Sequence, residues 1–324
     1  MKIYLAGQNG WGHLVQNAIL GGEEGVRLYL AGGIAGNMNW AWKQAVKKPT
    51  VTLETLEDVV LKEVEKGKAG KNMRLYLAGS APWRSEGIYD SIIKDYHPYI
   101  LESFYYVDAD TERLLPLFGD FMLDSGAFTF LHDNTSYTNW KEYIERYAKF
   151  IVKNNITKFY ELDIDAVVGY EKVKEYRKRL EDLTGRQSIP VWHLNRGKEE
   201  FIKMCEEYSY VAIGGIAGQK KGSEVYKKYK ACFPWFINTA HKNKAKIHAL
   251  GYTSLEGITK HPFDSVDSTA WTTGNRFGYI YKFDGKTMQK IETPHGKKLG
   301  NPRQVALINY IEWLKFQKYA EENL

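Results

Sequence analysis

Short runs of β-branched and aromatic residues alternate with longer amphipathic segments from about residue 73 onward, and this alternation constrains the fold most. It is typical of parallel strands joined by crossover helices. The runs that predict strands cover residues 73–79, 99–107, 120–124, 158–164, 190–194, 210–215, 246–252 and 264–268. A closed (β/α)₈ barrel of the TIM type needs about this number of strands, so we expect an α/β chain of that class.

Helical patterns separate these runs and close the chain. They cover residues 140–154, 170–183, 223–233 and 302–323. The first seventy residues are less regular, because LYLAG or a close variant of it occurs at 3–7, 28–32 and 75–79, and either the first or the third string could open the barrel. A length of 324 residues suits one barrel with insertions. We therefore expect residues 1–324 to form a single catalytic domain, in which 8–72 are an insertion or a subdomain.

The composition indicates a globular protein of the cytoplasm. Hydrophobic residues make up 44% of the chain and charged residues 26%, which fits neither a disordered nor a membrane protein. No apolar run reaches the roughly 18 residues that span a bilayer, and the first residues lack the basic flank of a signal peptide. The cysteines, Cys205 and Cys232, have no metal-binding spacing, so we expect no metal and no cofactor.

The charge points weakly to a polyanionic partner. The net charge is +6, and lysines cluster near predicted loops and helix ends. Lys220, Lys221, Lys242 and Lys244 are the candidates for contacts with nucleic-acid phosphates. The alternative for each cluster is a solvated surface that binds nothing.

Polar residues and glycines follow several of the predicted strands. In a barrel the active site lies at the carboxyl ends of the strands, so these residues are candidates for chemistry. They are Asp124, Ser125, Asp163, His193, Gly214, Gly215, Asp264 and Asp267. Crowded carboxylates repel one another, which raises the pKa of one while another stays ionised. Cleavage of a glycosidic bond needs this division between an acid and a nucleophile.

Each of these residues also has a structural explanation. An Asp after a strand often caps the next helix, and an Asp-Ser-Gly string is often only a turn. Paired glycines such as Gly214 and Gly215 suit a tight turn without any ligand. The aromatic residues beside these strings, among them Phe128, could stack on a flat heterocycle or belong to the core.

The strings DSGAF, ELDID, PVWH, IGGIAG, HALG and FDSVDS, in this order over residues 120–271, resemble the motif series of the tRNA-guanine transglycosylase superfamily. The resemblance is closer to the compact phage-type members that modify DNA. It implies a barrel that exchanges a guanine in nucleic acid for a 7-deazaguanine base. The exchange would pass through a covalent intermediate between an Asp and C1′ of the sugar.

The resemblance also implies roles for individual residues. Asp124 would act in acid/base work or position the base, and Asp163 would hold the pyrimidine edge of the base. His193 stands where the family usually has a Gln that contacts the base carbonyl. The family's nucleophile matches Asp264, with Asp267 three residues later as the competing assignment. The remaining base-site residues would be Gly214, Gly215, Ser125 and Phe128.

One departure from the family pattern concerns the polymer substrate. The family usually carries a zinc site of three Cys and one His near the carboxyl terminus, whereas this chain has no Cys beyond Cys232. We therefore expect DNA as the partner, with tRNA as the second candidate and a 7-deazaguanine base as co-substrate. Two rivals remain, a hydrolase of small nucleosides or deazapurines and a barrel that binds nucleic acid without catalysis. The sequence leaves open whether the chain forms a homo-oligomer.

Overall fold

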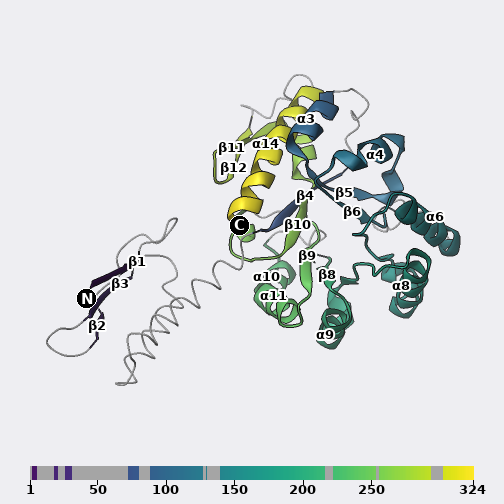
Figure 1. Cartoon of the computed structure of the whole chain (residues 1–324), viewed down its shortest axis with the longest axis horizontal. Helices are drawn as coiled ribbons and strands as arrows, with labels where there is room; N and C mark the ends of the chain where they lie inside the picture. Colours follow the sequence, from purple (N-terminus) through teal and green to yellow (C-terminus); the bar gives the residue numbers. More distant parts are fainter. Residues whose placement is uncertain are drawn as a thin grey trace. The chain divides into compact units, whose positions relative to one another are not determined.

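The structure is a computed structural model that describes residues 2–5, 18–20, 26–30, 72–79, 88–126, 129, 139–215, 222–252, 255–292 and 302–324 (Figure 1). The chain divides into two compact units, Met1–Ala69 and Gly70–Leu324. The first unit contains a three-stranded sheet in the order β1-β3-β2, built from β1 (Lys2–Leu5), β2 (Ala18–Leu20) and β3 (Val26–Leu30). The first two LYLAG-like strings pair in parallel within it, with Ile3 opposite Leu28.

The second unit contains a curled sheet of seven parallel strands in the order β6-β5-β4-β10-β9-β8-β7. The strands are β4 (Arg74–Ala78), β5 (Tyr99–Ser103), β6 (Asp120–Asp124), β7 (Val191–Trp192), β8 (Tyr210–Ile213), β9 (Lys246–Ala249) and β10 (Ser265–Ser268). The third LYLAG string, as β4, therefore belongs to this sheet, whereas the first does not. Isolated parallel bridges join Leu123 to Phe159 and Tyr160 to Ile189. The α/β class with parallel strands is confirmed.

Helices surround this sheet (Figure 1). They are α3 (Ile88–Tyr96), α4 (Ala109–Leu114), α6 (Trp140–Lys153), α7 (Asp165–Val168), α8 (Tyr170–Thr184), α9 (Gly197–Glu207), α10 (Glu224–Ala231), α11 (Phe233–Lys242), α12 (Leu255–Ile258), α13 (Gly274–Phe277) and α14 (Pro302–Asn323). Four of these helices, α6, α8, α10 and α14, begin and end within about two residues of the predicted positions. Local signals explain some of these ends, because Ser223 caps α10 through Tyr226 N–H and Gly185 ends α8 in the left-handed conformation. No helix in the described part of the chain is long and apolar enough to cross a membrane.

The sequence analysis did not predict the hairpin of β11 (Tyr279–Phe283) and β12 (Met288–Glu292). Its turn contains Asp284 and Gly285, and Gly285 has a φ of +98°, which glycine adopts without strain. Helix α14 packs against both β11 and β4. Gln317 of this helix receives the Tyr99 N–H at 3.0 Å and donates to the Leu75 carbonyl at 2.6 Å. The C-terminal helix is thereby fastened to β4 and β5.

The inner face of the sheet is identified by an apolar cluster made of strand residues and strand-like segments. Its members are Tyr76, Ala78, Leu101, Met122, Tyr160, Ile189, Val191 and Ala212. Because side chains alternate along a strand, the residue two places after each member points to the same side. Asp124 follows Met122 in this way, His193 follows Val191, and Gly214 follows Ala212. These site candidates therefore continue the inner face toward the carboxyl ends of the strands.

Candidate active site

Three carboxylates from separate strand ends gather at the carboxyl edge of the sheet. Asp124 ends β6, Asp267 lies near the end of β10, and Asp163 follows the segment that bridges to β6 and β7. Burial, together with the negative charges of Asp163 and Asp267, raises the pKa of Asp124. The parallel topology explains this convergence, because all the carboxyl ends meet at one edge.

Asp124 is the carboxyl group that is best suited to act as an acid. Burial and, less strongly, the two neighbouring carboxylates raise its pKa, and the Gly126 N–H, which donates to Oδ2 at 2.8 Å, opposes the shift, so that the resulting pKa is about 6. Gly126 has a φ of +81°, and a Cβ there would lie 2.9 Å from the Tyr105 Cβ. The glycine is therefore required for this turn. Near neutral pH a useful fraction of Asp124 keeps its proton.

Asp267 is only 5% exposed, and one of its carboxylate oxygens accepts hydrogen bonds. The Gly251 N–H donates to its Oδ1 at 2.6 Å, and His248 Nε2 lies 3.1 Å from the same oxygen. Among the described residues, every hydrogen bond to Asp267 falls on Oδ1. Its Oδ2 is therefore the oxygen that is left to react.

Asp163 and His193 form a close pair. His193 Nε2 lies 2.7 Å from each carboxylate oxygen of Asp163. Burial by itself lowers the pKa of His193, but the hydrogen bond and the charge of Asp163 outweigh it, so the pKa is raised above its ordinary value. A protonated His193 would present its free ring edge as a donor.

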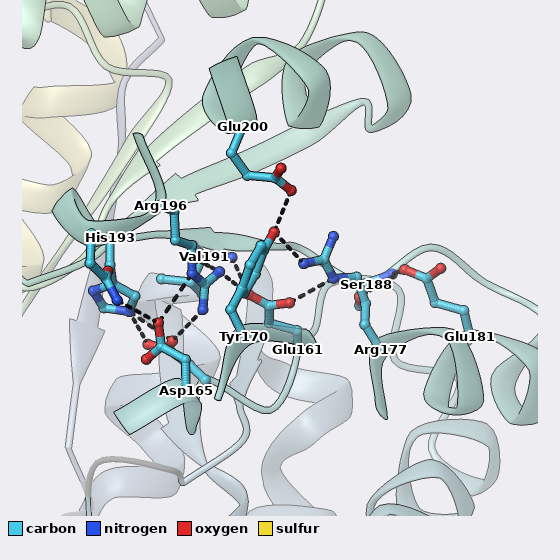
Figure 2. Close-up of polar contacts among 12 residues, drawn as sticks. Glu161, Asp165, Tyr170, Arg177, Glu181, Ser188, Val191, His193, Arg196 and Glu200 are labelled. Carbon is cyan, nitrogen blue, oxygen red and sulfur yellow. Dashed lines mark hydrogen bonds and ion pairs between the residues drawn. The ribbon is translucent and has the colours of Figure 1, made fainter. Parts of the chain in front are cut away.

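A buried arginine holds this pair in place (Figure 2). Arg196, whose side chain is 1% exposed, binds Glu161 at 2.8 Å and reaches Asp163 and Asp165 at 3.3 Å each. Its guanidinium lies 4.2 Å from the centroid of the Tyr170 ring. One cation thus compensates three carboxylates, with Arg177 taking the other oxygen of Glu161 at 2.6 Å. Such compensation is needed because unpaired charges are costly inside a protein.

Asp163, Asp165 and His193 also have atoms of the kind that bind metals, and these atoms lie within 4.8 Å of one another. The sequence analysis expected no metal. Arg196 pairs with both aspartates, so a cation bound among the three would be placed beside a guanidinium. We therefore describe this trio as part of the Arg196 network.

Gly214 allows the His193 ring to lie against the backbone. A Cβ on Gly214 would be 2.6 Å from His193 Cε1 and 2.8 Å from Val191 Cγ1, so any side chain would displace the imidazole. Gly215 has a φ of +80°, which favours glycine. The Gly214 carbonyl accepts a hydrogen bond from the Tyr229 hydroxyl at 2.7 Å.

The expected position of Asp264 at the carboxyl end of a strand is wrong. Asp264 directly precedes β10, and its Oδ2 accepts the Ile247 N–H at 2.8 Å and lies 2.9 Å from His241 Nε2. Its backbone also pairs with Arg74 and Ile247, at the amino ends of β4 and β9. The FDSVDS string offered two aspartates three residues apart, and the strand begins between them. Asp264 therefore lies at the opposite edge of the sheet from Asp124.

Lys242 and Lys244 lie at the edge of the sheet opposite the carboxylates. Both lysines lie between the end of α11 and the start of β9, and both are exposed. A connection from a helix to a parallel strand lies at the amino edge of the sheet. These two lysines cannot therefore contact phosphates at the rim that carries the carboxylates. Lys220 and Lys221 lie outside the described residues.

Among the other expected base-site residues, Phe128 also lies outside the described residues. Ser125 is fully buried, and its carbonyl accepts the Tyr143 hydroxyl of α6 at 2.6 Å. This contact fixes the turn after β6 through the backbone. The sequence analysis missed Glu161, Arg196 and His248 as site residues. Glu161 had one signal, an acidic residue inside an otherwise apolar strand pattern.

Comparison with known protein families and with curated proteins finds no match. Among solved structures, the chain is similar to a protein described as a fructose-1,6-biphosphate aldolase of Coccidioides immitis, with 12% identity and a TM-score of 0.42, over 80% of this chain and 90% of that one. It is also similar to Rhizobium etli pyruvate carboxylase, with 12% identity and a TM-score of 0.37, over 80% of this chain and 30% of that one. Sequence identities and TM-scores this low do not indicate that the proteins share a reaction.

Proposed function

We propose that this chain exchanges guanine for a 7-deazaguanine base in DNA, through a covalent intermediate between Asp267 and C1′ of a deoxyribose. The observation that carries the proposal is the convergence of Asp124, Asp163 and Asp267 at one edge of a parallel sheet. The ordered motif series over residues 120–271 supports the choice of base and reaction. The family resemblance alone favoured Asp264 as the nucleophile, but the geometry favours Asp267.

The proposed exchange has two steps. Asp267 Oδ2 attacks C1′ of a deoxyguanosine whose base is flipped out, the C1′–N9 bond breaks, and Asp124 gives its proton to the departing guanine. The nucleophilic N9 of the incoming 7-deazaguanine base then attacks C1′, the C1′–Oδ2 ester bond breaks, and the proton of the base returns to Asp124. Asp267 leaves as a carboxylate, so the enzyme ends in its starting state.

The base would bind beside Asp163. The carboxylate of Asp163 can accept N–H groups from the pyrimidine edge of a guanine, while protonated His193 can donate to a carbonyl oxygen. Arg196 fixes the orientation of Asp163. Gly214 leaves space for the His193 ring beside this position.

We further propose that the sheet closes into a complete eight-stranded barrel. The bridges from Leu123 to Phe159 and from Tyr160 to Ile189 support this, because they extend from β6 toward the residues before β7. The segment around Phe159 and Tyr160 would be the eighth strand. DNA is proposed rather than tRNA because the chain lacks the cysteines of the family's zinc site.

The test uses the full chain with duplex DNA labelled in guanine, and separately with tRNA, in the presence of a 7-deazaguanine base. We expect base-dependent release of label from DNA and a protein–DNA adduct that survives SDS. Asp267→Ala should abolish both, and Asp264→Ala is the matched control that should retain both. Release from tRNA alone would change the polymer and keep the chemistry.

Other outcomes would reject the proposal. Activity on free nucleosides without any polymer would indicate a small-molecule hydrolase. Nucleic-acid binding with neither release nor adduct would indicate a binding protein. Equal loss of activity in Asp264→Ala and Asp267→Ala would contradict the assignment of the nucleophile.

A further inference from the structure

A chain of hydrogen bonds crosses the interior of the sheet from β8 to β10. The Tyr210 hydroxyl lies 2.5 Å from Ser265 Oγ, which lies 2.5 Å from His248 Nδ1. His248 Nε2 then lies 3.1 Å from Asp267 Oδ1. His248 and Ser265 are fully buried. Polar groups are costly in such a position unless each has a partner, and here each has one.

With an ionised Asp267 and a neutral His248, the chemistry of the groups fixes the direction of every hydrogen bond in this chain. An ionised Asp267 can only accept, so His248 Nε2 must donate to it. A neutral imidazole then accepts at Nδ1, so the Ser265 hydroxyl must donate to His248. The single proton of Ser265 is thereby used, and the Tyr210 hydroxyl must donate to Ser265 Oγ. All three hydrogen bonds therefore point toward Asp267.

Surrounding groups support this direction. Burial raises the pKa of Tyr210 well above its ordinary range, so its hydroxyl keeps its proton and can donate. The imidazole of His248 lies between two aromatic rings, with centroid distances of 6.1 Å to Tyr76 and 5.8 Å to Tyr160, at interplanar angles of 60° and 64°. These edge contacts restrain rotation of the imidazole about its side-chain bonds.

We propose that His248, aligned by Ser265 and Tyr210, is a positioning residue that holds Asp267 with Oδ1 engaged and Oδ2 free to attack C1′. This inference rests on the proposed function. When Oδ2 bonds to C1′, Oδ1 becomes the carbonyl oxygen of the ester and keeps both of its donors, His248 Nε2 and the Gly251 N–H. When the ester breaks, the same donors stabilise the negative charge that returns to Asp267.

The first experiment does not depend on activity. Spectra of the full chain labelled with ¹⁵N-histidine, with His248→Gln used for assignment, should show His248 protonated at Nε2 and unprotonated at Nδ1 at neutral pH. The Nδ1 signal should shift in Ser265→Ala. A ring that is protonated at Nδ1, singly or together with Nε2, would overturn the proposed direction of the hydrogen bonds.

The second experiment measures the rate of adduct formation with DNA in a single turnover. His248→Phe keeps the ring shape but has no donor, so the rate should fall about 100-fold with little change in DNA affinity, because the nucleophile loses its orientation. His248→Gln should recover much of the rate, since its amide N–H can reach Asp267. His241→Gln, at the amino edge of the sheet, is the matched control and should react like the unmodified chain.

The outcomes separate the two proposals. An unchanged rate in His248→Phe, or a folded His248→Gln that is no faster than His248→Phe, would overturn the positioning role. If the unmodified chain forms no adduct with either polymer, the proposed function fails, and the histidine spectra still decide whether the hydrogen-bonded chain exists as described.

Discussion

Arg196→Met tests whether the buried charge network stabilises the fold. The substitution keeps much of the apolar stem but removes the guanidinium from Glu161, which is fully buried. Breaking a buried ion pair from one side costs about 3–5 kcal/mol, because the remaining charge is left uncompensated. Arg177 still binds Glu161 at 2.6 Å, and the Val191 N–H still donates to it at 2.8 Å. We therefore expect the free energy of unfolding to fall by about 3 kcal/mol, the lower end of this range.

The assay is urea unfolding, followed by circular dichroism, with a thermal scan beside it. A loss of this size lowers Tm by about 6–12 °C in a unit of this length. Lys178→Met is the control, because Lys178 and Asp182 form an exposed pair with side chains 77% and 58% exposed, and its effect should stay below about 0.5 kcal/mol. A loss below about 1 kcal/mol in Arg196→Met would refute the reasoning.

Further predictions concern Asp124 and Gly214. The rate of guanine release should fall as pH rises through about 6, because Asp124 then loses the proton that it donates, and Asp124→Asn should remove this pH dependence and lower the rate by about 100-fold or more. The raised pKa also means that the folded chain binds this proton more tightly than the unfolded chain, so stability is lost as pH rises from about 4 to about 6. Asp124→Asn should therefore be more stable than the unmodified chain at pH 8 by on the order of 3 kcal/mol, and equally stable at pH 4, in urea unfolding. Gly214→Ala should destabilise the fold by about 1–3 kcal/mol and raise KM for the incoming base, since its Cβ displaces His193, and His193→Ala in the same chain should relieve part of the loss of stability.

The strands could be predicted because their residues follow a local pattern, but the edge at which each polar residue lies could not always be predicted. Asp124 ends an apolar run, so its place at the carboxyl edge followed from the sequence. In FDSVDS the run is short and has an Asp on either side of its apolar residue, so the pattern fits both assignments. Pairing of β10 with β4, about 190 residues earlier in the chain, decides between them. That register is a property of the whole sheet.

The buried charged residues could not be predicted from the sequence, for a different reason. Glu161 and Arg196 are of types that are almost always exposed, so a sequence pattern assigns them to the surface. They are buried because each compensates the other across 35 residues of chain, at 2.8 Å. His248 was part of the HALG string, but its contact with Asp267 depends on both side chains facing the interior. Only the alternation of two neighbouring strands, in their actual register, brings these side chains together.

The three carboxylates of the site lie in different chemical environments because their hydrogen-bonding and charged partners differ. Asp163 is held by His193 and Arg196. Among the described residues, the donors to Asp267, which are His248 and the Gly251 N–H, all fall on Oδ1. Asp124 is buried and has two negative neighbours, which favour its protonated form and outweigh the backbone hydrogen bonds that it accepts. Identical side chains thus lie in three environments that suit the three proposed tasks, base recognition, nucleophilic attack and proton donation, and exchanging any two of these environments would abolish the proposed reaction without changing the composition of the site.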